Sequence, residues 1–568
     1  AVLAIHSDGS ARMLEHEILH MASREAIQEH AEQKLPRGKL LRIRTIKADG
    51  RTLEPEVVQG KPTVTMPHLE LGDYIETETL YDLPGDGRGG KTFVSPRWFF
   101  REEKVDYFRS EFVVVSPKGR PLDIETTGQV PAPQIVEQGA SVERRWRVDK
   151  SPALVLEPFS ARVDEFLPSV RLGWGVSRRE TLERLREVST SMIPPDPRLA
   201  RVALTIATAG APLAEQGAVL RRLPKEERAR RIYRWVLDNV EPGREGDPRK
   251  TVLGKSGNRS EAFVYLARLA GVEVKHAVVS DRLAPPPIGP ISEVELISQV
   301  ALSVTGDKRN VWMVVGDKYA PFGYLPSSLR GQPAVVLDAA LTATTTDTGG
   351  PPDGVTHEGE ADLAADGSAN IRLVQSYTGR LAIELRSAIQ TLPEDRLEDI
   401  VEAKLVAQAI PGGRLKSLDI EGLTDLDAPL VLKMEIEAST FAKRSGGDLI
   451  LSPPFQITMA PLVTLQRRET PLVISHAMAI RVGVNLRVKL PEGAKVSVGA
   501  PVQASHGGRT FSVGDRMDGA ALVLQRSVDL PAGRVQPSEY EAFGGFVRSA
   551  EEALQRDWVV HLSGEAAK

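Results

Sequence analysis

GKSGNRSEAFVYLARLAGV, residues Gly254–Val272, carries a turn rich in Gly, Ser and Asn directly into an apolar helix that ends at Gly271. The segment EVKHAVV follows, so the pattern predicts a turn, a helix and then a strand. The free N–H groups and the positive dipole end of a helix favour an anion, and enzymes place nucleophiles at such junctions. Here the junction carries Asn258, Arg259 and Ser260, and the chain contains no cysteine. The stretch therefore predicts the architecture of an active site without a thiol nucleophile.

The composition is that of a globular protein with several domains. A chain of 568 residues is too long for one hydrophobic core, and its content is 41% hydrophobic and 26% charged. The absence of cysteine excludes disulfides, zinc–thiolate sites, iron–sulfur clusters and thiol catalysis. A net charge of −4 gives no electrostatic case for nucleic acid or for an anionic membrane.

Two features of the sequence bear on membrane association and export. No apolar run approaches the roughly 18–20 residues of a membrane-spanning helix, so we expect any membrane association to come through partners. The chain begins at Ala1 without methionine, and we expect a processed or truncated start from which any export signal has been removed.

Hydrophobic periodicity divides the chain into three parts. Residues 1–180 contain short strands separated by Gly and Pro turns, which predicts a β-rich sandwich or half-barrel. Residues 181–341 begin with helical spacing and end with strands, which predicts an α+β domain. Thr, Gly and Pro dominate residues 342–354, and we interpret this stretch as a linker or an exposed loop. Residues 342–568 as a whole return to strands with accessory helices, which predicts a second β-rich sandwich.

Four segments resemble those of bacterial transglutaminase-like proteins that carry the N-terminal domain DUF3857. IKADGRTLEPE and LELGDYIETETLY are similar to parts of that N-terminal domain, RRIYRWVLDNV is similar to the helix before the transglutaminase core, and APFGYLPSSLRGQPAVVL is similar to the segment that closes it. The resemblance implies a DUF3857-like β domain over 1–180. It also implies a transglutaminase-like α+β core of the papain-like cysteine-protease type over 181–341, and a C-terminal β-sandwich region over 342–568.

The resemblance also implies where a catalytic triad would lie. Active members use Cys, His and Asp, with the thiol at the start of the core helix and the other two side chains on the strands that follow. By position the Cys site is Arg259, with Asn258 or Ser260 as neighbouring alternatives. The His site is Gln299 and the Asp site is Val314. Glutamine cannot take up a proton at neutral pH and valine cannot orient an imidazole, so we expect the chain to be inactive.

A serine nucleophile is the alternative within the enzyme class. Ser256 or Ser260 would attack, and His276 would be the base, because no other histidine lies between residues 68 and 357. His276 sits on the predicted strand among valines. The simpler interpretation is a strand histidine that faces solvent or is capped by a neighbour.

HEILH at residues 16–20 matches the zinc motif H-E-x-x-H. The motif binds zinc only on a helix, where residues i and i+4 share a face. Because this segment follows the turn Asp8–Gly9–Ser10, we expect a strand, on which His16 and His20 would lie roughly 13 Å apart. A metallopeptidase would need a third ligand among Glu29, His30 and Glu32, and we expect no metal here.

Two groups of charges have simple structural interpretations. An arginine at a helix N-terminus opposes the helix dipole, so we expect Arg259 to pair with an acid such as Glu261 or to point outward. The alternative is a site that binds a carboxylate or phosphate, and we favour the surface salt bridge. The basic helix over 221–234 interleaves Lys, Arg and Glu, which is typical of a solvated face rather than of nucleic-acid binding.

The sequence thus predicts a catalytically inactive transglutaminase-like protein that binds protein partners, as a scaffolding component of a bacterial cell-envelope assembly. The extracytoplasmic, periplasmic setting is implied by the resemblance alone. We expect no cofactor. A hydrolase or acyl-transferase that uses Ser260 or Ser256 with His276 is the second hypothesis, and the metallopeptidase is the third.

Overall fold

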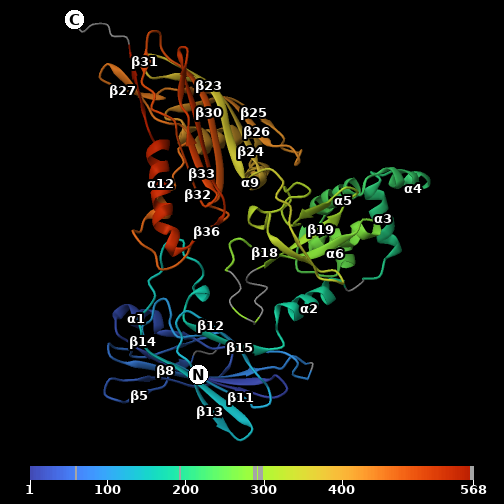
Figure 1. The fold of residues 1–568 in the computed structure, drawn as a ribbon, viewed down its shortest axis with the longest axis vertical. Helices are drawn as coiled ribbons and strands as arrows, with labels where there is room; N and C mark the ends of the chain where they lie inside the picture. The colour runs from blue at the N-terminus through green and yellow to red at the C-terminus, as the bar shows by residue number, and fades with distance from the viewer. Residues whose placement is uncertain are drawn as a thin grey trace. The chain divides into compact units, whose positions relative to one another are not determined.

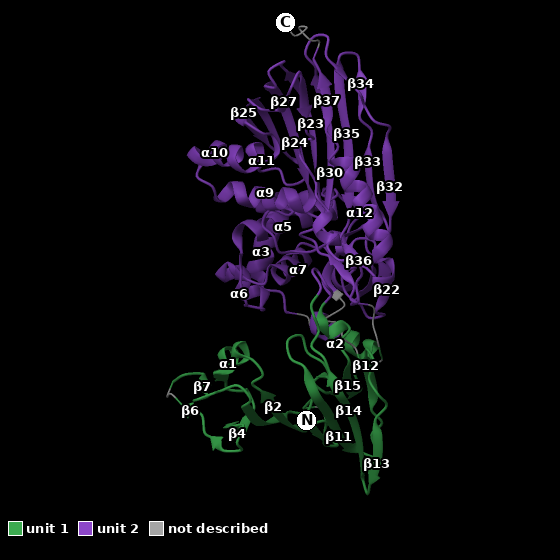
Figure 2. Ribbon diagram, turned by 90° about the vertical axis from the view of Figure 1, so that its left-hand side faces the viewer, with its two compact units in different colours: residues 1–156, 162–184, 286–294 green, residues 157–161, 185–285, 295–568 purple. Residues whose placement is uncertain are grey.

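The computed structural model describes residues 1–57, 60–87, 89–190, 193–285, 289, 291 and 298–562. They form two compact units, coloured separately in Figure 2. The first unit contains residues 1–156, 162–184 and 286–294, and the second contains 157–161, 185–285 and 295–568, in each case as far as they are described. The boundaries at 180 and 341 between three domains stay a prediction.

The first unit is built on an eight-stranded sheet. Its strand order is β13 (Gln134–Gln138), β14 (Ser141–Ser151), β11 (Tyr107–Pro117), β1 (Val2–Ile5), β2 (Ala11–His20), β8 (Tyr74–Leu83), β4 (Lys39–Ile46) and β5 (Thr52–Leu53). A second sheet joins β10 (Trp98–Phe99), β15 (Ser169–Trp174), β12 (Asp123–Thr127) and β9 (Phe93–Val94).

The two sheets of the first unit bury one shared core. Phe112 and Trp146 from the large sheet pack in the same cluster as Leu172 and Trp174 from the small one. The ring centroids of Phe112 and Trp98 lie 5.4 Å apart in a stacked arrangement. Because these large aromatic side chains each bury a wide apolar area, they hold the two sheets together.

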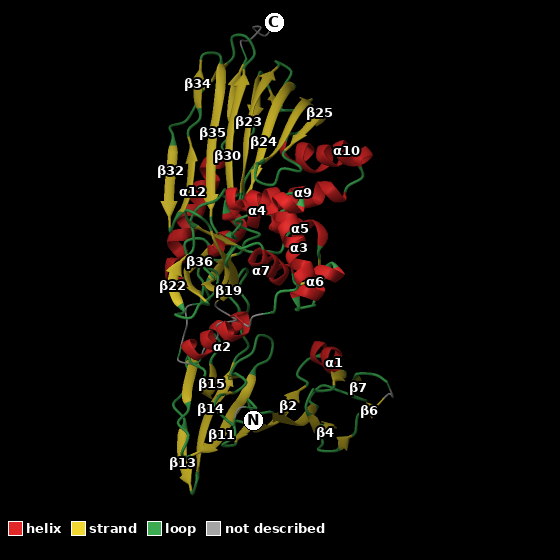
Figure 3. Ribbon diagram, turned by 90° about the vertical axis from the view of Figure 1, so that its right-hand side faces the viewer, coloured by secondary structure: helices red, strands yellow, loops and turns green. Residues whose placement is uncertain are grey.

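The second unit begins with an α+β region. Its sheet has five strands in the order β20 (Asn310–Met313), β19 (Ser298–Thr305), β18 (Val274–Ser280), β21 (Pro333–Val336) and β22 (Thr342–Thr345). Helices α3 (Pro197–Ala207), α5 (Lys225–Asn239), α6 (Pro248–Gly254) and α7 (Arg259–Leu269) gather beside this sheet, as Figure 3 shows in red. Phe263 and Leu266 of α7 lie in one core with Leu302 and Met313 of the sheet, so the helices cover that face.

A large antiparallel and parallel sheet forms the rest of the second unit. Eight of its nine strands follow the order β25 (Gly413–Glu421), β26 (Leu430–Ala438), β24 (Ala369–Thr378), β23 (Gly354–Leu363), β30 (Ile480–Lys489), β35 (Ala521–Leu530), β33 (Arg509–Val513) and β32 (Val502–His506). The ninth, β34 (Arg516–Asp518), pairs with β35. A smaller sheet of β27 (Ala442–Ser445), β28 (Asp448–Leu451), β37 (Trp558–His561) and β31 (Lys495–Val496) shares its core. In Figure 1, α12 (Tyr540–Leu554) lies along β32 and β33, and its apolar side packs with them. Helix α9 (Gly379–Thr391) follows β24.

The prediction of a linker or exposed loop over 342–354 is wrong for its first four residues. Its first residues form β22, which pairs with β21 at the edge of the five-stranded sheet. Threonine has high strand propensity because its β-branched side chain suits a pleated surface, and this outweighed the low apolar content. Elsewhere the architecture is multidomain and β-rich, as predicted. Within the described residues, no helix is both long and apolar enough to cross a membrane.

Candidate functional site

The turn before α7 is built from residues with special backbone requirements. Lys255 ends α6 in the left-handed conformation, with φ at 53°. Gly257 has φ at 146°, and a Cβ there would lie 2.4 Å from the hydroxyl oxygen of Thr251. Asn258 caps the helix, because its Oδ1 accepts hydrogen bonds from the backbone N–H groups of Ser260 and Glu261 at 3.0 and 3.3 Å. The turn, the helix and the strand after it form where the sequence predicts them.

Arg259 is turned inward at the first position of α7, and its side chain is buried. Its Nε donates to the carbonyl oxygen of Val240 at 2.6 Å, and its Nη1 donates to that of Gly316 at 2.8 Å. A longer bond of 3.5 Å joins Nη2 to the carbonyl oxygen of Leu237. Leu237 and Val240 end α5, where unpaired carbonyls and the negative dipole end favour a cation.

The expected position of Arg259 is therefore corrected. We expected it to pair with Glu261 or to point outward, on the ground that a cation opposes the dipole at the start of α7. In the structure the guanidinium lies against the C-terminal end of α5 instead, so the dipole of that helix stabilises it. The side chain ties the end of α5, the start of α7 and the loop after β20 to one another.

Ser260 and His276 make separate contacts. The hydroxyl of Ser260 donates to the carbonyl oxygen of Val315 at 3.2 Å. His276 Nε2 lies 3.1 Å from Glu261 Oε1, and its side chain is 9% exposed. Neither Ser260 nor the exposed Ser256 has a hydrogen bond to His276. The pair of an acid and a histidine is present, but it holds no hydroxyl group in position to be activated.

One expectation from the sequence was that a neighbouring residue caps His276, and in the structure that residue is Glu261. Glu261 is the third residue of α7, and the chain turns back after α7 to run past it as β18. The alternation along β18 places His276 on the same face as Val274, which packs against α7. Two features of the sequence therefore indicate the pair of Glu261 and His276. Glu261 is an acid in the first turn of α7, and His276 shares with Val274 the face of β18 that packs on α7.

Gln299 and Val314 lie apart from Arg259. On β19, Leu302 and Val304 face α7, so Ala301 and Gln299 face the other side of the sheet. On β20, Met313 faces α7, and Val314 packs with Trp312 and Ala301 in the cluster on the opposite face. Gln299 is also exposed. The structure does not bring these two side chains to the start of α7.

The positions that do face α7 are also unable to transfer a proton. Leu302 pairs with His276 across β18 and β19, and Met313 pairs with Leu302 across β19 and β20. Both side chains are apolar and buried. Neither Leu302 nor Met313 therefore supplies a base or an acid from β19 or β20.

HEILH forms part of β2, as the sequence predicts. His16 Nε2 lies 3.0 Å from Glu76 Oε1, and the ring of His20 stacks on Tyr74 with centroids 4.7 Å apart. His30, one of the proposed third ligands, contacts Gln33. Throughout the described residues, no group of three or more His, Asp or Glu side chains is arranged to hold a metal ion.

Comparison with known proteins gives one informative result. No protein-family model matches the sequence, and no curated protein matches it. A crystal structure described as that of a “putative protease” from Parabacteroides distasonis is similar over 99% of this chain and 98% of its own, with a TM-score of 0.58 and 14% identity. The two proteins share a fold. At this identity the likeness extends to the fold alone, and the assignment to DUF3857 and to the transglutaminase-like proteins stays a prediction.

Proposed function

We propose that this chain is a catalytically inactive transglutaminase-like protein that acts by binding other proteins. The observation that carries the proposal is the state of Arg259, the residue at the position expected for the nucleophile. A guanidinium stays protonated and has no lone pair to attack a carbonyl carbon. Here it is also buried and bonded to backbone carbonyls of two neighbouring segments. The extracytoplasmic setting and the role in a bacterial cell-envelope assembly follow from the resemblance and belong to the same proposal.

The serine alternative is less well supported by the geometry. The hydroxyl hydrogen of Ser260 is engaged by the Val315 carbonyl, and the Nε2 atom of His276 is engaged by Glu261. A nucleophile and its base need to lie within hydrogen-bond reach of each other, and this pair makes no such bond.

Labelling with a fluorophosphonate probe tests the loss of activity. The full chain should not be labelled, and it should neither cleave casein nor incorporate a fluorescent amine into it. The Ser260→Ala and His276→Gln variants should behave as the wild type does. Labelling that disappears in both variants would establish the serine enzyme instead.

Photocrosslinking tests the binding role. Leu253 is 65% exposed at the end of α6, immediately before the turn that leads to α7. A photoreactive amino acid at this position should capture a defined protein in cell-envelope fractions from the native source. Val559 on β37 is 43% exposed and serves as the matched control position. Capture of the same proteins from both positions, or of none from Leu253, would contradict a binding surface beside α7.

A further inference from the structure

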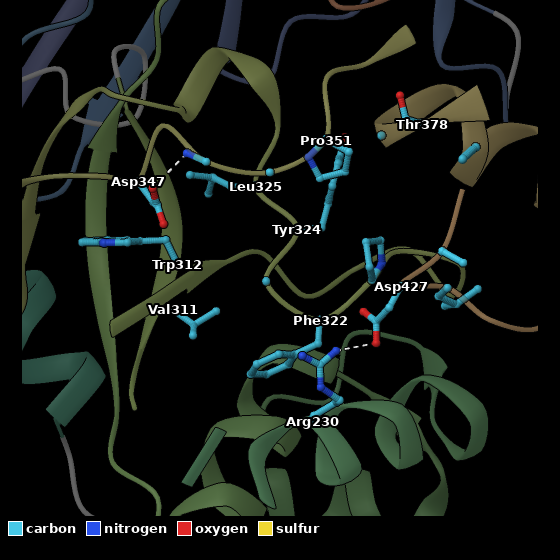
Figure 4. Close-up of a pocket in the computed structure, with 18 of the residues that line it drawn as sticks. Arg230, Val311, Trp312, Phe322, Tyr324, Leu325, Asp347, Pro351, Thr378 and Asp427 are labelled. Atoms are coloured by element: carbon cyan, nitrogen blue, oxygen red, sulfur yellow. Dashed lines mark hydrogen bonds and ion pairs between the residues drawn. The ribbon is translucent and has the colours of Figure 1, made fainter. Parts of the chain in front are cut away.

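A cavity of about 320 Å³ lies in the second unit, away from the start of α7. Its walls come from the first turns of α5, from β20 and the loop after it, from residues 347–351, and from the start of α9. Figure 4 shows Phe322, Tyr324 and Thr378 around an open centre. The volume is within the range of small-molecule sites, at its lower end.

Most of the arginines at the cavity already have an acidic partner. The pairs, with nitrogen–oxygen distances of at most 4.0 Å, are Arg230–Asp427, Arg309–Asp347 and Arg330–Asp353. Glu226, at the first turn of α5, has no basic partner in the described part of the chain, and the positive dipole end of that helix favours it there. The paired charges cancel locally and leave little attraction for a ligand.

Arg386 differs from these arginines. It projects from α9 into the wall of the cavity, is 1% exposed, and has no carboxylate within 4.0 Å among the described residues. Its Nε and Nη2 donate to the carbonyl oxygen of Gly422, and Nη2 also donates to those of Asp425 and Ala428. Burial lowers the pKa of Arg386 from its usual value, although an arginine remains charged at any physiological pH.

One amino group of Arg386 is still free. Nη1 makes no hydrogen bond to any described residue, and it keeps some exposure to solvent. A buried cation with a spare donor is the arrangement that gains most from a charge-assisted hydrogen bond. The first turn of α9 also borders the cavity through Gly379, but Asp353 already occupies its positive dipole end, because Asp353 Oδ1 accepts a hydrogen bond from the Arg380 N–H at 2.8 Å.

The remaining walls suit an apolar ligand body. Phe322 and Tyr324 present aromatic rings, and Ala382 and Leu426 present aliphatic side chains. Burial raises the pKa of the Tyr324 phenol, so its hydroxyl is protonated and can donate. That hydroxyl has no hydrogen-bond partner in the described part of the chain.

We propose that this cavity binds a small organic carboxylate. The carboxylate accepts a hydrogen bond from Arg386 Nη1, and the apolar body of the ligand lies against Phe322 and Tyr324. Among the four lining arginines in the described structure, Arg386 alone lacks an acidic partner, so a carboxylate would pair with it. The unpaired Glu226 makes these charges neutral in sum, and the attraction is therefore local to Arg386. Such a group is found on a free carboxylic acid and also at the C-terminus of a peptide. The site does not depend on the proposed loss of activity at α7.

Calorimetric titration of the full chain tests this site. The probes are N-acetyl-L-phenylalanine, its carboxamide, and the peptide Gly-Gly-Phe with a free or an amidated C-terminus. The acid should bind at least tenfold more tightly than its carboxamide. A peptide that binds as well as the acid identifies a chain end as the ligand source, whereas a peptide that does not bind identifies a free acid. Equal affinity for acid and carboxamide, or no binding of the acid at 5 mM, would overturn the proposal.

Variants locate the site. Arg386→Gln should abolish binding of N-acetyl-L-phenylalanine. Because Arg386 also holds the carbonyls of residues 422–428, that variant can fail to fold, and Ala382→Leu is the second variant. Ala382 is 3% exposed and borders the cavity, so leucine there fills part of it while the Arg386 side chain is kept. The affinity should fall at least tenfold, and far-UV circular dichroism at the titration temperature checks that the variant is folded. The matched control is Arg372→Gln on β24, whose side chain is 71% exposed. Ala382→Leu binding like the wild type would contradict the proposed location.

Discussion

Two buried arginines, Arg259 and Arg386, differ in how their guanidinium groups are hydrogen-bonded. Arg259 uses all of its nitrogens on backbone carbonyls around the start of α7. Arg386 lines a cavity and makes four hydrogen bonds to backbone carbonyls through Nε and Nη2, one more than Arg259, yet its Nη1 has no partner among the described residues. A buried guanidinium that is fully bonded holds segments of the chain together. One that retains an unused donor can also bind a ligand.

Removing Arg259 should have the largest effect. Arg259→Ala leaves the carbonyls of Leu237, Val240 and Gly316 without their donor, so the free energy of unfolding should fall by about 4 kcal/mol. Urea denaturation measures this fall, with Arg372→Ala as the exposed control, for which the change should stay below about 0.5 kcal/mol. A fall of less than about 1 kcal/mol for Arg259→Ala would mean that water replaces the guanidinium at little cost.

His357 extends the comparison to an ionisable group that stays neutral when buried. The Tyr377 hydroxyl donates to Gln375 Oε1 at 2.8 Å, so the amide nitrogen of Gln375 faces His357 Nδ1 at 3.0 Å and donates to it. The ring also stacks on Phe455 with centroids 4.0 Å apart. Burial lowers the pKa of His357 from 6.5 to about 4.

This shift has a defined sign. As the pH falls below about 6.5 the unfolded chain takes up a proton that the folded chain refuses, so stability is lost until the pH reaches about 4. The loss amounts to about 3 kcal/mol and is absent above pH 7. Urea denaturation between pH 7 and 4 should show that the free energy of unfolding of His357→Gln falls less with decreasing pH than that of the wild type. An identical decline for both proteins would place the pH dependence elsewhere.

Ligand binding should distinguish the site of Arg386 from the start of α7, where Arg259 lies. At a concentration ten times its dissociation constant, N-acetyl-L-phenylalanine should stabilise the folded chain by about 1.4 kcal/mol. Ser260→Ala, at the start of α7, should retain this gain, and Ala382→Leu should lose most of it. Thermal denaturation with and without the acid measures both. Loss of the gain in Ser260→Ala alone would move the binding site to α7.

The smallest effect is expected at Glu261. Its side chain is 35% exposed, so the ion pair with His276 is partly screened by solvent. Glu261→Gln should lower the free energy of unfolding by about 0.5 kcal/mol and leave the protein without detectable hydrolase activity. A loss comparable to that of Arg259→Ala would show that the pair, rather than the arginine, holds this end of α7.

Local features of the site could be predicted from the sequence. The Asn258 cap, α7 and β18 are encoded by neighbouring residues, and so is the strand that contains HEILH. The contacts of Arg259 could not be predicted, because Val240 and Gly316 lie 19 and 57 residues away in the chain. The side of the sheet to which Gln299 points depends on strand register, and a one-residue error reverses it.

Arg386 was within reach of sequence reasoning. In GRLAIELRSAIQT, the residues Ala382, Ile383 and Ile389 mark the buried face of α9, and Arg386 occupies the same face at helical spacing. A charged residue on an apolar face indicates a buried polar contact or a binding site. Which of the two it makes depends on the loop at 422–428, whose conformation no local pattern specifies.

The way Arg259 is held constrains how this chain can evolve. A substitution that introduced a thiol at position 259 would supply a nucleophile and, in the same step, remove the donor that α5 and the loop after β20 rely on. A variant that gained a nucleophile at position 259 would therefore also be destabilised. Selection for folding alone therefore favours the arginine, and acquiring cysteine catalysis at this position would require compensating changes elsewhere beforehand.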